Sequence, residues 1–338
     1  MNIRENYPLK NLNTFGLDVY ASYFIEIENE DQLFPFLESR YYKPDRFLVI
    51  GGGSNLLFKG NYEGTLLKYS VKGIKIIDES PDEIILESSG GELWDDLVAY
   101  TVEREYYGLE NLTLIPGTVG AAPIQNIGAY GVELKDYFYY LEYINLETRS
   151  LKKIYKSDCR FGYRDSIFKN QLKNKSVITR VAFRLSKQKK LNLSYKSLYD
   201  ELKNIPDKDL TIRTVRETVR KIRESRLPDP LVIGNAGSFF KNPEVSNEYY
   251  YSLIKKHPDI VAFKVNDSVY KISAGWLIEK CGYKGKRIGN VGSYGKQALI
   301  IVNYGGASGM EILNFVEKIM EDVKSNFGIE LISEVNII

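Results

Sequence analysis

The sequence holds few of the residues that build metal centres or thiol- and imidazole-based catalysts. Its 338 residues include one histidine, His257, and two cysteines, Cys159 and Cys281. This supply is too small for a structural zinc site, a four-cysteine iron–sulfur cluster or a disulfide framework, so we predict no metal. A Ser-His-Asp or Cys-His triad would need His257, which stands where a helix is expected to end. The two distant cysteines fit a reducing compartment.

An excess of one charge and long apolar runs are also missing. Lys and Arg total 46 against 44 Asp and Glu, a formal net charge of +2, which argues against binding nucleic acid mainly by neutralising its phosphates. No uncharged run approaches the ~20 residues that cross a bilayer, and residues 1–16 have no apolar signal-peptide core. We therefore expect a cytoplasmic protein with no membrane or nucleic-acid partner. The sequence does not fix the oligomeric state, and a monomer is compatible with it.

Hydrophobic periodicity predicts an α+β protein with antiparallel sheets. The expected strands are residues 23–28, 47–50, 66–68, 74–77, 83–87, 137–145, 176–185, 297–302 and 329–337. The expected helices are residues 31–39, 92–107 with Gly108 as its stop, 211–226, 249–256, 274–280 and a long one that begins at a Ser308–Glu311 capping box and closes at Gly328. In the helix 211–226, an apolar stripe is formed by Ile212, Val215, Val219 and Ile222.

A glycine turn follows the strand 47–50. It consists of Gly51, Gly52, Gly53, Ser54 and Asn55, an arrangement that lets backbone N–H groups approach a pyrophosphate. It is not a dinucleotide-binding fingerprint, because Leu56 takes the place of the third glycine and residues 56–58 continue as strand. No GxxxxGK[ST] phosphate loop occurs either. A tight β-turn without a ligand is an equally open interpretation of this motif alone.

A second segment, residues 108–131, loses periodicity and is rich in glycine, proline, asparagine and small residues. Its centre, residues 115–131, reads IPGTVGAAPIQNIGAYG. Two such segments favour an extended ligand with a pyrophosphate in the middle. The alternative is a large Ω-loop packed on itself.

These segments belong to a set of eight ordered blocks. They are residues 13–16 (NTFG), 51–55 (GGGSN), 108–112 (GLENL), 115–120 (IPGTVG), 123–131 (PIQNIGAYG), 159–166 (CRFGYRDS), 227–230 (LPDP) and 234–243 (GNAGSFFKNP). In this order and spacing, the chain resembles the UDP-N-acetylenolpyruvoylglucosamine reductase (MurB) family, in its long form, nearly end to end. The resemblance implies a three-domain fold of the vanillyl-alcohol-oxidase (PCMH) type. FAD-binding subdomains would cover residues 1–70 and 71–226, the latter with the final strand 329–338, and residues 227–328 would bind the substrate.

The resemblance also implies cofactors and a reaction. NADPH would supply a hydride, through FAD, to the enolpyruvyl ether of UDP-N-acetylglucosamine enolpyruvate, giving UDP-N-acetylmuramate for peptidoglycan synthesis. The FAD would be bound non-covalently, because no histidine or cysteine is positioned for covalent attachment to the flavin and His257 lies well outside the two FAD-binding segments. The implied FAD-binding residues are Gly51, Gly52, Gly53, Ser54, Asn55, Pro116, Gly117, Gly120, Ala121, Gln125, Ile127, Gly128 and Tyr130.

Three residues match the family's catalytic positions: Arg164 for the substrate carboxylate, Ser238 as proton donor to C2, and Glu334 as a neutral acid. Without the resemblance, Arg164 would be assigned to a salt bridge with Asp165, Ser238 to a turn and Glu334 to a surface strand. The diphosphate and uridine are expected to meet Tyr195, Arg226, Asn242 and Gln297.

The chain departs from the family pattern at a few positions. Arg226 stands where a known relative has lysine, which keeps the charge, and Asn336 stands where arginine is expected. Ala121 and Ala122 replace a serine pair, so only their backbone can meet the flavin. Two rival interpretations remain open at this point: an oxidase of another sugar or alcohol on the same FAD fold, and a nucleotide-sugar or flavin binder without catalysis.

Overall fold

The computed structural model describes residues 2–338 and divides into two compact units. The first unit comprises residues 2–7, 21–52 and 63–225, and the second comprises residues 8–20, 53–62 and 226–338. Both units mix helices and strands, which confirms the expected α+β class. Short 3₁₀ turns punctuate the chain at η1 (Lys10–Leu12), η2 (Glu30–Gln32), η3 (Pro44–Arg46), η4 (Glu110–Leu112), η5 (Ala122–Gln125) and η6 (Ile167–Lys169).

One sheet of the first unit has four strands in the order β1-β2-β5-β3. Their bounds are Ile3–Pro8 for β1, Tyr20–Ile27 for β2, Tyr62–Tyr69 for β5 and Phe47–Ile50 for β3. The pair β3 and β5 runs parallel, so the expectation of purely antiparallel sheets is wrong here. Parallel neighbours need a crossover, and residues 51–61, which carry the glycine turn, provide it. The short helix α1 (Leu33–Leu37) packs its buried residues into the core of this sheet.

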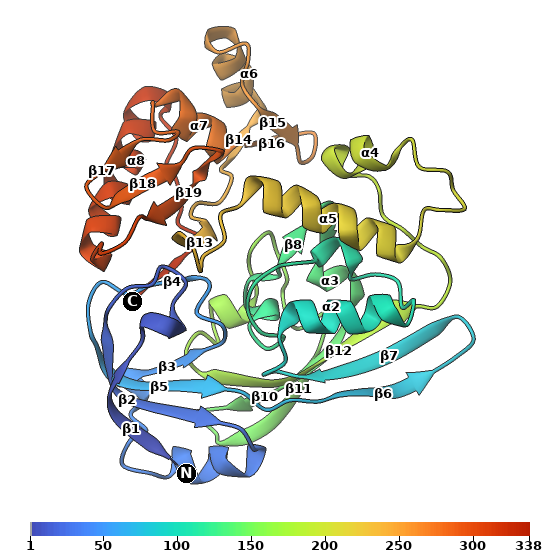
Figure 1. The fold of residues 1–338 in the computed structure, drawn as a ribbon, viewed down its shortest axis with the longest axis vertical. Coiled ribbons are helices and arrows are strands. Elements are labelled where there is room, and N and C mark those ends of the chain that lie inside the picture. The colour runs from blue at the N-terminus through green and yellow to red at the C-terminus, as the bar shows by residue number, and fades with distance from the viewer. Residues whose placement is uncertain (1) are drawn as a thin grey trace. The chain divides into compact units, whose positions relative to one another are not determined.

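The larger sheet of the first unit is antiparallel, in the order β11-β10-β12-β7-β6. Its strands are β6 (Ile74–Glu79), β7 (Glu83–Ser89), β10 (Phe138–Asn145), β11 (Ser150–Tyr155) and β12 (Ser176–Ser186). The helices α2 (Trp94–Glu103) and α3 (Leu134–Tyr137) cover one face (Figure 1). Leu97 and Val98 of α2 share one core with β7 and β12.

The predicted end of α2 at Gly108 is wrong. The helix stops at Glu103, and Glu105 takes a left-handed backbone with φ of +56°. The Tyr106 amide then donates to the Thr101 carbonyl at 2.9 Å, the bond that closes a helix with a left-handed residue. Gly108 instead allows close packing, because a Cβ there would lie 2.6 Å from the Tyr137 ring.

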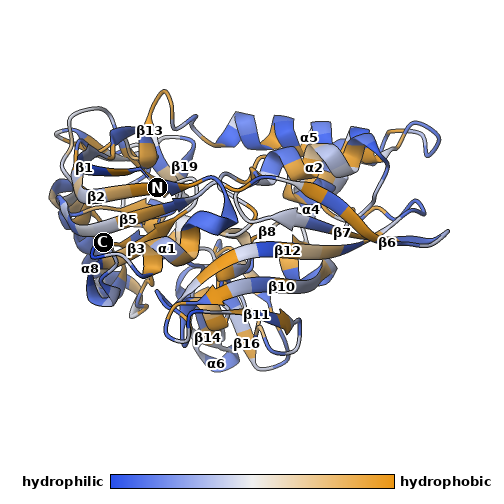
Figure 2. Cartoon of the chain, turned by 90° about the horizontal axis from the view of Figure 1, so that it is seen from below, coloured by the Kyte–Doolittle hydropathy of each residue, from blue (hydrophilic) through white to orange (hydrophobic). Residues whose placement is uncertain are grey.

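Two further helices lie on the outside of the first unit, α4 (Lys196–Leu202) and α5 (Ile212–Arg226). The predicted stripe of α5 is confirmed, since all four of its apolar residues are buried and three of them pack against Leu198 and Leu202 of α4. Figure 2 shows the resulting alternation of hydrophilic and hydrophobic segments along α5. The hairpin of β8 (Gly128–Ala129) and β9 (Val132–Glu133) lies within this unit.

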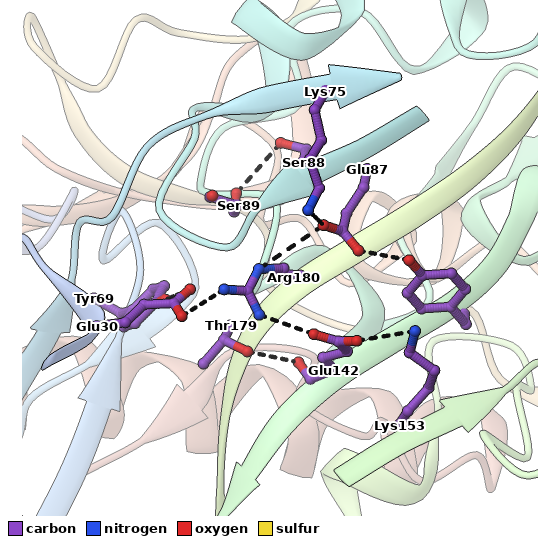
Figure 3. Close-up of polar contacts among 11 residues, drawn as sticks. Glu30, Tyr69, Lys75, Glu87, Ser88, Ser89, Glu142, Lys153, Thr179 and Arg180 are labelled. Carbon is purple, nitrogen blue, oxygen red and sulfur yellow. Dashed lines mark hydrogen bonds and ion pairs between the residues drawn. The ribbon is translucent and has the colours of Figure 1, made fainter. Parts of the chain in front are cut away.

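A polar network joins the two sheets of the first unit (Figure 3). Arg180 on β12 contacts Glu142 on β10 at 2.8 Å and Glu30 on η2 at 2.5 Å. Its Nε lies 3.8 Å from Glu87 on β7, whose other oxygen accepts a hydrogen bond from Tyr140. Burial alone would raise the pKa of Glu142, but hydrogen bonds from Lys153 and Arg180 outweigh it and lower that pKa.

Replacing Arg180 with methionine is expected to lower the free energy of unfolding by about 2–3 kcal/mol, because partly buried carboxylates lose a charged donor. Glu142 has a lowered pKa in the folded state, so its stabilising contribution exists above its ordinary pKa of 4.5 and is lost as the pH falls below it. The difference between wild type and variant should therefore shrink below pH 4.5. Urea unfolding at several pH values measures it. Arg184→Met, an exposed position on the same strand, is the control and should cost little.

Besides one two-stranded pair, the second unit contains two small sheets and three α-helices. One sheet has the order β13-β19-β18-β17, and the other β14-β16-β15. The strands are β13 (Gly234–Ser238), β14 (Glu244–Ser246), β15 (Ala262–Lys264), β16 (Val269–Ile272), β17 (Arg287–Ile288), β18 (Val291–Tyr294) and β19 (Gln297–Asn303). The helices are α6 (Asn247–Lys256), α7 (Ala274–Lys280) and α8 (Gly309–Phe327). His257 follows α6 as its C-cap, and the Ser308–Glu311 capping box and left-handed Gly328 bound α8, as predicted.

The expected strand 329–337 is mostly wrong. Only β20 (Asn336–Ile337) is a strand, and it runs parallel to β4 (Leu56–Leu57) inside the second unit. Ile329, Leu331 and Val335 are buried, whereas Ile337 is 40% exposed. The three-domain division from the sequence stays a prediction. Among residues 2–338, no helix has the length and apolar character needed to cross a bilayer.

Candidate active site

The two glycine-rich segments predicted from the sequence touch each other in the first unit. A Cβ on Gly51 would lie 2.6 Å from the Thr118 side-chain oxygen. A Cβ on Gly52 would lie 3.0 Å from the Cα atom of Gly117. The two backbones therefore meet where a side chain would displace one of them. We call residues 51, 52, 117 and 118 the glycine contact.

The second glycine segment packs on the start of the helix α2 and on β12. The Gly117 carbonyl accepts from the Trp94 amide at 3.0 Å, and the Val119 amide donates to the Glu92 carbonyl at 2.9 Å. Gly120 lies so close to β12 that a Cβ would stand 2.9 Å from the Ile178 carbonyl oxygen. These contacts fix the backbone of residues 117–120 against α2 and β12.

The glycine contact fits the pyrophosphate of a dinucleotide cofactor. Gly117 has φ of +115°, a conformation that side chains disfavour, and Pro116 before it is exposed. Ala121 continues the same surface, since a Cβ on Gly51 would stand 3.1 Å from the Ala121 Cβ. Where two backbones approach this closely and carry no side chains, their N–H groups can reach phosphate oxygens directly.

Gly52→Ala is expected to weaken retention of FAD by about tenfold, because the added Cβ pushes the Gly117 backbone away from its position in the glycine contact. Bound flavin, measured by absorbance after gel filtration, gives the result. Gly60→Ala is the matched control, since a Cβ at Gly60 would meet nothing within 4 Å. Equal flavin content in both variants would contradict a role for this contact in cofactor binding.

The segment 125–130 turns beside the candidate arginine. Gln125 ends η5, and Ile127 is buried with its carbonyl accepting from the Leu134 amide at 2.8 Å. Arg164 has φ of +51° in a tight turn, and its Nη2 donates to the Gly128 carbonyl at 2.7 Å. The structure therefore brings Arg164 to the loop predicted to bind FAD.

The side chains around this turn include two tyrosines. The rings of Tyr130 and Tyr195 meet edge to face, with their centroids 5.4 Å apart. Tyr195 is the N-cap residue of α4 and is 42% exposed. The carboxylate of Asp165, beside Arg164, accepts a hydrogen bond from Asn170 at 2.9 Å. The first unit thus gathers a guanidinium and two phenols at one turn.

The rest of the first motif belongs to the second unit. Gly53 has φ of +64°, and a Cβ there would lie 1.9 Å from the Leu12 carbonyl oxygen. Ser54 follows in the same turn, and the Asn55 carbonyl accepts from the backbone amide of Asn336 at 3.1 Å. The Asn55 side chain donates to the Glu334 carbonyl at 3.2 Å. The glycine turn is therefore tied directly to the segment that carries Glu334.

Ser238 and Glu334 lie on neighbouring backbone segments of the second unit. The Glu334 amide donates to the carbonyl of Phe239, the residue after Ser238, at 2.8 Å. A β-bridge joins Phe240 to Ser333 beside it. Two of the three candidate catalytic residues, far apart in sequence, are thus brought together, while Arg164 belongs to the first unit.

A bulge aims Ser238. The pairing of β13 with β19 shifts register between Asn235 and Ser238, and Gly237 between them has φ of +69°. Phe239, fully buried, anchors the chain on the far side. Bulges with a left-handed glycine re-aim the neighbouring side chain, and Ser238 is exposed at this one. Ser238 therefore lies on a paired, bulged strand and not on an ordinary turn.

The predicted diphosphate and uridine residues of the second unit lie near the start of α7. The Asn242 Oδ1 accepts from the Ala274 amide at 2.9 Å, and a Cβ on Gly275 would be 3.0 Å from the Gln297 Oε1. The structure therefore groups Asn242 with Gln297. Arg226 is exposed at the last position of α5.

Sequence reasoning missed three groups near this site. Burial raises the pKa of Glu110 to about 7, although hydrogen bonds from the Gly108 and Glu110 backbone oppose it. Burial also lowers the pKa of Arg223 on α5, whose Nε has no hydrogen-bond partner in the described structure. Asn111 is fully buried between two loops. The block 108–112 signalled a functional segment, but nothing in the sequence singled out a residue within it.

Within residues 2–338, no group of three or more His, Cys, Asp or Glu side chains is placed to hold a metal ion.

Two family models match the chain. One, described as an FAD binding domain, covers residues 21–149, and the other, described as the C-terminal domain of UDP-N-acetylenolpyruvoylglucosamine reductase, covers residues 229–338.

Curated relatives named UDP-N-acetylenolpyruvoylglucosamine reductase align over full length. The chain is 42% identical to the protein of Flavobacterium johnsoniae, with 100% of both chains covered. It is 44% identical to that of Bacteroides fragilis, over 99% of this chain and 100% of the relative. A crystal structure of the reductase from Thermus caldophilus is similar in fold, with a TM-score of 0.67, 22% identity, and coverage of 99% of this chain and 98% of that one.

Proposed function

We propose roles for the residues of this site on the premise that the chain belongs to the UDP-N-acetylenolpyruvoylglucosamine reductase family. The full-length match carries this premise, and with it the vanillyl-alcohol-oxidase type of FAD-binding fold expected from the sequence. The protein is an FAD-dependent oxidoreductase that consumes NADPH. It reduces UDP-N-acetylglucosamine enolpyruvate to UDP-N-acetylmuramate, a precursor of peptidoglycan.

The residues present fit FAD. When bound, FAD would supply the hydride-transfer chemistry between NADPH and C3 of the enolpyruvyl double bond. We assign the pyrophosphate to the glycine contact, whose backbone is too close-packed for side chains. The remaining FAD contacts are assigned to residues 53–55, 116, 120, 121, 125, 127, 128 and 130.

Arg164 is assigned to the carboxylate of the enolpyruvyl group. A vinyl ether accepts a hydride poorly unless the adjacent carboxylate takes up the developing negative charge. A guanidinium can hold both carboxylate oxygens in its planar fork, and the bond from Nη2 to the Gly128 carbonyl fixes the orientation of that fork. Fixed donors aimed at developing charge lower the barrier without reorganising during the reaction.

Glu334 and Ser238 are assigned to the hydrogen bond and to the single proton that this reduction needs beside the hydride. Glu334, held by its backbone against Phe239 and Asn55, would donate a hydrogen bond to the carboxylate in its neutral form. Ser238 would give a proton to C2 once C3 has received the hydride. The bulge at Gly237 and the pairing of segments 238–240 and 332–334 support this assignment, because they hold both residues on rigid backbone.

The diphosphate and uridine are assigned to Tyr195, Arg226, Asn242 and Gln297. Asn242 uses its Oδ1 on the first amide of α7, which leaves its Nδ2 to donate to a phosphate oxygen. Arg226 supplies a full positive charge. Tyr195 offers a phenol hydroxyl on an exposed ring that is braced by Tyr130.

The purified protein should be yellow, and NADPH should be oxidised when UDP-N-acetylglucosamine enolpyruvate is added. An anaerobic stopped-flow trace of the flavin with each substrate in turn measures both half-reactions. Turnover with oxygen that does not depend on the enolpyruvyl group would favour an oxidase of another substrate. A colourless protein that takes up no FAD would contradict the proposed function.

A further inference from the structure

One buried side chain joins two loops of the first unit. Asn111, on η4, is fully buried, and its Nδ2 donates to the Tyr130 carbonyl at 2.8 Å and to the Asn192 carbonyl at 2.9 Å. The two acceptors belong to loops that are far apart in sequence. A single amide therefore ties the loop 128–131 to the loop 191–195.

A second link reinforces the first from the surface. The Asn192 side chain donates to the Gly131 carbonyl at 3.2 Å and accepts from the Ser194 amide at 3.1 Å and hydroxyl at 2.7 Å. Gly131 has φ of +83°, and a Cβ there would lie 2.9 Å from the Ser194 hydroxyl. The two loops are in contact over several residues, with Asn111 beneath them.

The tied loops carry one residue of the proposed site, Tyr195, and bind another, Arg164. Tyr195 follows Ser194 directly, and its ring packs edge-on against Tyr130. Arg164 donates to the carbonyl of Gly128 in the same turn. The turn 128–131 is therefore a common support for Tyr195 and for Arg164, and Asn111 holds that support to the Tyr195 loop.

The chemistry of Asn111 points to a role for its donors. Its Oδ1 is buried and has no hydrogen-bond partner in the described part of the chain. An unpaired buried acceptor is unfavourable, and leucine would fill the same space without it. Asparagine differs from leucine here by its two donated hydrogen bonds, which link the two loops. The presence of asparagine therefore supports a role for that link.

We propose that Asn111 is a positioning residue that fixes Tyr195 for the substrate diphosphate. The inference rests on the proposed role of Tyr195. Ser194 and Tyr195 are exposed, so without the link from below they would have to be ordered when the nucleotide sugar binds. Ordering a loop in advance removes that cost from binding and strengthens affinity without a new contact to the ligand.

The test compares Asn111→Asp in two backgrounds. Aspartate keeps the shape but places a carboxylate oxygen against two carbonyl oxygens, so KM for UDP-N-acetylglucosamine enolpyruvate should rise about tenfold while kcat stays within about threefold. In a Tyr195→Ala background the same substitution should change KM by less than about twofold, because residues that act as a unit are not additive. An equal rise in both backgrounds would overturn the proposal.

Hydrogen exchange provides a readout that does not depend on activity. In Asn111→Asp, amides of residues 128–131 and 191–195 should exchange at least ~tenfold faster than in wild type. Val181→Ala, which leaves a cavity in the centre of β12, controls for general loss of stability and should leave KM unchanged.

If Asn111→Asp does not fold, Asn192→Ala removes the hydrogen bond to Gly131 from the surface and should show the same dependence on Tyr195. Unchanged exchange and KM in these variants would refute the link, whereas an inactive wild type with slow loop exchange would refute the proposed function alone.

Discussion

Ser238→Ala is expected to slow the half-reaction with the enolpyruvyl substrate by ~10²–10⁴-fold, the range for loss of a general acid, and to leave the half-reaction with NADPH unchanged. The split follows from the assigned role, because the hydroxyl is needed only when C2 takes up a proton. Alanine keeps the backbone of the bulge, since Gly237, not Ser238, carries its left-handed conformation. Anaerobic stopped-flow traces with each substrate measure the two rates.

Ser252→Ala is the control for this substitution. Ser252 lies exposed on α6 in the same unit, and its hydroxyl bonds only to the preceding turn, at the Tyr249 carbonyl. Both half-reactions should keep their wild-type rates in that variant. If Ser238→Ala slowed both half-reactions equally, Ser238 would have a structural role and the proton would have to come from another group.

Arg164→Lys is expected to reduce kcat/KM for the enolpyruvyl substrate by ~10²–10³-fold, as removal of an oriented donor to a developing oxyanion does. Lysine keeps the positive charge but not the planar fork, and its ammonium cannot both bond to the Gly128 carbonyl and hold two carboxylate oxygens in the same plane. The FAD content should stay near that of wild type. Steady-state kinetics with flavin quantification separates the two effects.

Arg160→Lys is the matched control for Arg164→Lys. Arg160 lies in the same loop, is exposed, and has a similar backbone conformation, with φ of +49° against +51° for Arg164. Its activity should be unchanged. Wild-type kcat/KM in Arg164→Lys would show that charge alone suffices at this position and would remove the carboxylate fork from the mechanism.

Local patterns predicted the helices whose buried stripe and caps agree. The apolar spacing of α5 and the capping box of α8 are each decided by neighbours within a turn or two. The end of α2 was misplaced because glycine is the usual left-handed residue and Glu105 took that role instead. The final segment alternates like a strand, but its pairing was decided by distant partners in β4 and at Phe240.

The sequence motifs predicted which residues form the candidate site, but they did not predict how those residues are arranged in space. The glycine segments announced close backbone approach, and the structure brings Gly52 and Gly117 into contact. Nothing local could place Glu334 beside Phe239, because that hydrogen bond joins residues separated by most of the second unit's length. The sequence did not predict a role for Asn111 for a similar reason, since that role depends on two carbonyls that only the folded chain brings together. The roles of the individual site residues stay predictions.

The second unit is assembled from three separate stretches of the chain, residues 8–20, 53–62 and 226–338. This has a consequence for folding during synthesis. The early segments leave the ribosome long before their partners are translated, so Gly53 and Asn55 must wait while residues 63–225 are made. Those residues are contiguous and include a complete antiparallel sheet, which can form during the delay. Substitutions that delay folding of residues 63–225, or that leave residues 8–20 and 53–62 exposed for longer, should reduce the yield of folded protein before they change its catalysis.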